Sequence, residues 1–69
     1  MRSDQESAAQ WYERAIVANS VAAAQEETLA NAGEPTAIRV AHLRAGEAAS
    51  ELQQALEALH EERRLQQLR

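Results

Sequence analysis

Near the C-terminal end of the sequence, Glu57 and His60 have the residue types and spacing of a metal-binding motif. A glutamate followed three residues later by a histidine is used by helical bundles that hold a pair of metal ions. Such a centre needs both side chains to face inward, together with glutamates from two further helices. On a helix, Leu59 would face inward and Glu57 would project away from that side. The other histidine, His42, would lie about 27 Å away along the same helix. The sequence therefore predicts no metal site and no cofactor.

Nucleophilic catalysis has equally little support. The chain contains no cysteine, and all of its basic residues other than histidine are arginine. No serine stands in an arrangement of nucleophile, base and orienting group, and no glycine-rich segment could cradle a phosphate. The lack of cysteine also excludes disulfides, iron–sulfur clusters and thiolate zinc sites. We therefore expect a non-enzymatic protein of the reducing cytoplasm.

The charge balance narrows the classes of partner. The formal net charge is −4 at pH 7 and the isoelectric point is near 5.0. Nucleic-acid binding usually depends on neutralising phosphates, so an acidic chain is disfavoured for it. No stretch approaches the ~18 apolar residues of a membrane span, and the first residues lead into no signal-peptide core. The expected partners are proteins, not membranes.

The composition, together with residues that start and end helices, predicts two helices. Alanine, glutamate, glutamine, leucine and arginine dominate, and these are strong helix formers. Gly33 suits the left-handed end of a helix, and Pro35 suits the first turn of the next one. Ser3 and Glu6 fit a capping box at the start of the first helix.

These signals give an all-α, single-domain chain over residues 1–69. The first helix is expected at about 4–31, the turn at about 32–34 and the second helix at about 35–67. A connection this short joins antiparallel neighbours, so the fold is a two-helix hairpin. In the hairpin, Ala8 would face Leu59 and Ala15 would face Leu52.

The first helix carries more apolar surface than one neighbouring helix can cover. The run from Ala15 to Ala24 is apolar on nearly every side, as expected of a buried helix. We therefore expect a homodimer, formed as a four-helix bundle with the middle of the first helix at the twofold axis. The alternative is that alanine and valine simply tolerate exposure here. The expected dimer-interface residues are Ile16, Val17, Asn19, Val21 and Ala24.

Two polar residues fall on the inner side of the first helix. Asn19 could fix the register by meeting its symmetry mate, or it could lie at the edge of the inner side. Glu26 is expected to form an ion pair near the turn with either His42 or Arg39. The sequence does not decide between these two partners.

The last residues of the second helix are the best candidates for binding another protein. Leu65 and Leu68 form a short apolar patch among arginines, the pattern of helix-in-groove recognition. The alternatives are a fraying helix end and a further contact of the dimer. The aromatic pair near the start of the chain is a second candidate, because aromatic residues and arginine dominate binding hot spots. It could instead plug the open end of the hairpin. The expected partner-binding residues are Trp11, Tyr12, Arg63, Arg64, Leu65 and Leu68.

The sequence thus favours a dimeric, non-catalytic interaction module that binds and inhibits, masks or escorts a larger protein. Phage- or plasmid-encoded inhibitors of host regulators and small chaperones have this scale, which is an analogy of size and architecture. One alternative is a nucleic-acid-binding regulator with an arginine patch; another is a purely structural assembly subunit. The arginines of that patch would be Arg39, Arg44, Arg63, Arg64 and Arg69.

Overall fold

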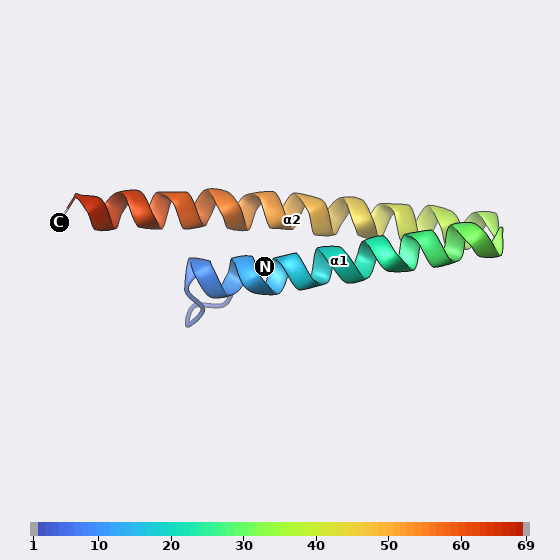
Figure 1. Ribbon diagram of the computed structural model, residues 1–69, viewed down its shortest axis with the longest axis horizontal. Helices are drawn as coiled ribbons and strands as arrows, with labels where there is room; N and C mark the ends of the chain where they lie inside the picture. Colours follow the sequence, from blue (N-terminus) through green and yellow to red (C-terminus); the bar gives the residue numbers. More distant parts are fainter. Residues whose placement is uncertain (1, 69) are drawn as a thin grey trace.

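A computed structural model describes residues 2–68 as a hairpin of two antiparallel α-helices (Figure 1). Helix α1 covers Ala8–Ala32 and helix α2 covers Pro35–Gln67. No strand occurs among residues 2–68. The prediction of an all-helical chain whose two helices pack against each other is confirmed. Within residues 2–68, neither helix has the length and apolar character needed to cross a membrane.

The start of α1 differs from the prediction. Ser7, not Ser3, is the N-cap: its hydroxyl accepts a hydrogen bond from the Gln10 amide at 3.1 Å, and the Gln10 side chain accepts one from the Ser7 amide at 2.9 Å. Ser3 and Glu6 form a separate turn, in which the Glu6 amide donates to the Ser3 carbonyl. The start predicted at residue 4 was therefore wrong. Two capping signals compete here, and the second one adjoins Ala8, the first buried residue of α1.

The turn between the helices is closed by a cap on each side. Gly33 has a φ of 78° and donates its amide to the Leu29 carbonyl, which ends α1. Glu34 then caps α2, because its carboxylate accepts hydrogen bonds from the amides of Thr36 and Ala37 at 3.2 and 2.6 Å. The sequence predicted the roles of Gly33 and Pro35 but not that of Glu34.

The core is a narrow seam of small side chains. Buried residues recur every seven positions on α1, as they do in a coiled coil. Large side chains such as Leu52 and Tyr12 are only half-buried. Alanine in the seam lets the two helices lie close together, but each layer removes little apolar area from water. The buried residues are Ala8, Ala15, Ala22, Ala41, Ala55 and Leu59.

Candidate functional site

The middle of α1 exposes large apolar side chains. Val17 is 63% exposed and Val21 is 50% exposed. Ala24 is also exposed and continues their line along the helix. We call Val17, Val21 and Ala24 the back stripe, because they lie about 180–240° around α1 from the buried Ala15. Within residues 2–68, the side chains of this stripe therefore remain open to solvent.

The other two residues predicted for the dimer interface lie elsewhere. Ile16 is 41% exposed and lies on the flank of α1, about 100° from Ala15. Asn19 is half-buried on the side of α1 that faces α2. The structure therefore does not bring the five predicted residues together, because only three of them share the back stripe.

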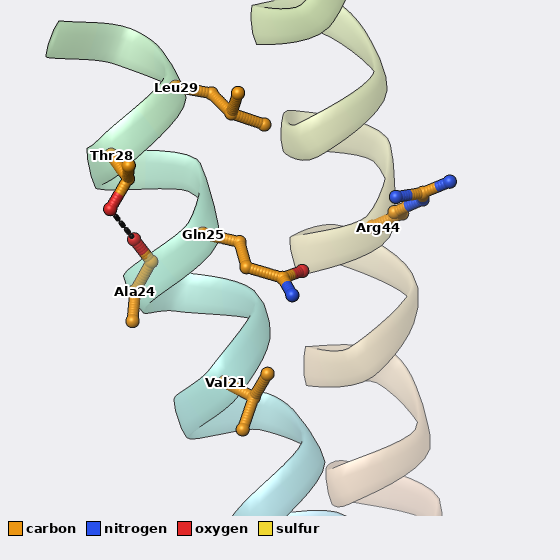
Figure 2. A pocket seen from close by; sticks show the side chains of 6 residues that line it. All are labelled: Val21, Ala24, Gln25, Thr28, Leu29 and Arg44. Carbon is orange, nitrogen blue, oxygen red and sulfur yellow. Dashed lines mark hydrogen bonds between the residues drawn. The ribbon is translucent and has the colours of Figure 1, made fainter.

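A shallow groove of about 520 Å³ adjoins one edge of the back stripe. Figure 2 shows that Gln25 and Leu29 reach from α1 toward α2, and that the Arg44 guanidinium turns away from α1. The Thr28 hydroxyl is occupied by a hydrogen bond to the Ala24 carbonyl at 3.0 Å. Arg44 is thus the one titratable side chain in the lining. The lining residues are Val21, Ala24, Gln25, Thr28, Leu29 and Arg44.

Polar contacts join the two helices along their length. Near the turn, His42 Nδ1 lies 2.8 Å from Glu26 Oε2, so Glu26 contacts His42 and not Arg39 among its two predicted partners. Toward the other end, Trp11 Nε1 donates to Glu51 Oε1 at 3.3 Å. These contacts fix the register of the two helices.

At the open end of the hairpin, Glu62 of α2 binds the start of the chain. Its Oε2 atom accepts hydrogen bonds from the Ala8 amide at 3.2 Å and from Arg2 Nη2 at 3.3 Å. The Ala8 amide belongs to the first turn of α1, where amides lack partners within the helix. Sequence reasoning missed this cap. The available signal was spacing, since Glu62 follows Leu59 by three residues on the inner side of α2.

Two local ion pairs hold arginines near the ends. Arg14 binds both carboxylate oxygens of Glu6 at 2.9 Å, and this hydrogen bonding lowers the pKa of Glu6 and raises that of Arg14. Arg64 binds Glu61 in the same two-armed way, and the hydrogen bonds lower the pKa of the Glu61 carboxyl. Arg64 is therefore already engaged within α2.

The residues predicted to bind a partner form two separate groups. Trp11 and Tyr12 are half-buried within the hairpin. By contrast, Leu65 and Leu68 are 50% and 72% exposed. They lie beyond Glu62, where α2 extends past the start of α1 (Figure 1). We call residues 63–68 the overhang; Arg63 and Arg64 lie on it and are also exposed.

The other candidate sites are dispersed. Among residues 2–68, no group of three histidine, aspartate or glutamate side chains is placed to hold a metal ion. Glu57 and His60 are both exposed. The arginines of the nucleic-acid alternative are spread along α2 from Arg39 to Arg64, and Arg69 lies outside the described residues.

Comparison with protein-family models, curated proteins and solved structures found no match for this chain. Val40 and Leu43 on α2 are exposed as well. Function is inferred from the back stripe of α1, which lies in an uncharged segment, and from the overhang of α2.

Proposed function

We propose that this chain is a small, non-catalytic interaction module that forms a homodimer through α1 and binds a larger protein with α2. The observation that carries the proposal is the back stripe. Its two valines, Val17 and Val21, are 63% and 50% exposed to solvent. They lie at the centre of the longest uncharged segment of the helices. Contiguous apolar patches of this kind mark interaction sites.

The surface area of the hairpin supports self-association. Its accessible surface is 5310 Å². A compact monomer of this mass is expected to expose about 4,300 Å². The excess of roughly 1,000 Å² is comparable to the ~800 Å² that each partner buries in an interface of standard size. The elongated shape, 54 × 18 × 14 Å, is the source of this excess.

The overhang supports the second half of the proposal. Leu65 and Leu68 are one helical turn apart, so both can enter the same groove of another protein. Arg63 lies next to them and could pair with an acidic rim. A module of this kind would inhibit, mask or escort its target by covering a surface on it.

The dimer is tested by measuring mass with light scattering for the chain and for Val17→Glu. We expect the chain to have the mass of a dimer and Val17→Glu that of a monomer, because the change buries a charge at the twofold contact. The matched control is Val40→Glu, an exposed valine on α2, which should remain dimeric. A monomeric mass for the unchanged chain would overturn the dimer.

The partner is tested by capture from the source cell with the chain and with a Leu65→Ala, Leu68→Ala variant. We expect one protein to be retained stoichiometrically in moderate salt by the chain and lost by the variant. Because both leucines are exposed, the variant should keep its helical circular dichroism. Retention of nucleic acid alone, lost as salt is raised, would favour the alternative of a nucleic-acid regulator.

A further inference from the structure

The direction in which the back stripe points determines how two hairpins can associate. Val17, Val21 and Ala24 lie about 180–240° around α1 from Ala15, which faces α2. Val17 and Ala24 are therefore opposite the seam with α2, and Val21 lies between them and the groove that α1 shares with Arg44 of α2. A second hairpin bound to the stripe would have α1 between itself and α2.

We infer that the dimer is a flat row of four helices in the order α2–α1–α1–α2, and not the square bundle expected from the sequence. This inference rests on the proposed dimerisation. In a square bundle, each α1 contacts its second neighbour about 90° away from its first. On α1 the two such directions are occupied by Ile16 and Ala23 on one flank and by Ala18 and Gln25 on the other, the flank that Val21 borders. Among these four flank residues only Ile16 is a large apolar side chain, and at 41% it is less exposed than Val17, which lies opposite the seam at 63%.

A second copy of the chain is the occupant that the charges favour. Residues 15–25 contain no charged side chain on any side of α1. A partner with charges at this level would leave them unpaired in an apolar contact, which is costly. A twofold axis near the middle of this segment places the same uncharged stretch of a second α1 against it. The area of roughly 1,000 Å² in excess of a compact monomer is enough for one such interface.

A row has a consequence that a square bundle lacks. The two α2 helices would lie at opposite edges, separated by three interhelical spacings of 8–10 Å, or about 24–30 Å between axes. Both overhangs would then be free and would face away from each other. The dimer could therefore engage two copies of a target, or two sites on one target, at the same time.

The test uses the absence of cysteine, which allows single labels to be introduced. Ser50 is exposed on the outer side of α2, so Ser50→Cys with a spin label reports the separation of the two α2 helices in the dimer. After allowance for the label linkers, we expect about 24–30 Å between helices from pulsed electron resonance, against about 8–14 Å for a square bundle. The shorter separation would overturn the row.

Disulfide formation gives a second readout. Because the two copies of α1 run antiparallel about an axis near residue 20, the double variant Val17→Cys, Ala24→Cys should be cross-linked between copies under mild oxidation, and the matched flank control Ile16→Cys, Ala23→Cys should not. The reverse result would overturn the row even if Ser50→Cys labelling failed. Mass measured on the same samples separates the two proposals: a monomer contradicts the dimer itself, and a dimer with a short separation or a cross-linked flank control contradicts only the row.

Discussion

A single carboxylate oxygen of Glu62 links α2 to the start of the chain. That atom accepts hydrogen bonds from the Ala8 amide on α1 and from Arg2 in the segment that precedes α1. A residue next to the helix in sequence usually supplies the cap, as Ser7 does for α1 and Glu34 for α2. Glu62 instead caps α1 from the other helix, so the start of α1 depends on the correct position of α2.

Replacing Glu62 by alanine is therefore expected to destabilise the chain by about 1 kcal/mol, because the Ala8 amide loses its acceptor. The matched control is Glu61→Ala. Within residues 2–68, Glu61 pairs with Arg64 one turn away on the same exposed surface, so its loss should have a smaller effect. Urea unfolding of both variants measures the difference. Equal losses would show that Glu62 does not act as a cap.

The ion pair of Glu6 and Arg14 predicts a local pH response. Because hydrogen bonding to Arg14 lowers the pKa of Glu6 from its ordinary value of 4.5, the carboxylate favours the folded segment. A group whose pKa is depressed on folding contributes stability above its unfolded pKa and loses it as the pH falls through its folded pKa. Residues 2–7 should thus detach from α1 only in acid, below pH 4.5.

Nuclear magnetic resonance titration of the Glu6 carboxyl carbon checks this response. Its midpoint should lie below 4.5, the ordinary value for a glutamate. In Arg14→Ala, the Glu6 midpoint should return to its ordinary value. An unshifted midpoint in the unchanged chain would contradict the ion pair.

At the residue scale, sequence reasoning was limited by choices between equivalent partners. The inward position of Glu26 was predictable from periodicity, but both His42 and Arg39 were within reach. Likewise, Ser3 and Ser7 each begin a capping sequence, and the start of α1 depends on which one adjoins the packed surface. These choices are made by tertiary contacts, which local patterns do not contain.

At the scale of the elements, the two glycines have opposite roles. Gly33 ends α1 with a positive φ of 78°, whereas Gly46 lies within α2 in ordinary helical backbone. A Cβ atom at either position would meet nothing within 4 Å. Packing is therefore equal at the two sites, and only the backbone conformation distinguishes them.

Alanine at these positions should change stability in opposite directions. Gly33→Ala is expected to cost about 1–2 kcal/mol, because an L-residue is strained in the left-handed region. Gly46→Ala is expected to stabilise the chain by about 0.5–1 kcal/mol, because alanine loses less backbone entropy in a helix. Thermal unfolding followed by circular dichroism measures both. A stabilising Gly33→Ala would contradict the left-handed cap.

The elements themselves were the most predictable part of the molecule. Strong helix formers, with Gly33 and Pro35 in succession, leave little choice but two helices and a tight connection. The seven-residue recurrence of inward positions, such as Ala8, Ala15 and Ala22, follows from the same pattern. Helix ends were less predictable, because a cap outside the pattern, as at Ser7, moves the boundary.

At the scale of the whole molecule, the hairpin is long and thin. Its radius of gyration is 15.1 Å, whereas a compact chain of this length is expected to have about 11 Å. Sequence periodicity identified α1 as apolar on several sides but did not rank those sides. The ranking required the exposure of Val17, Val21 and Ile16 in the folded hairpin, which depends on how α2 covers α1.

The alanine seam also determines which contacts can specify the register of α1 against α2. In the alignment predicted from the sequence, Ala15 faces Leu52 and Ala8 faces Leu59. If α2 slid by seven residues, Ala15 would face Leu59 and Ala22 would face Leu52, so small would still oppose large. Because the seam repeats every seven residues, its packing does not distinguish one register of the two helices from another that is shifted by a heptad. The short connection and the polar contacts of Glu26 and Glu62 select one register. A longer connection would therefore allow α2 to shift by a heptad along α1.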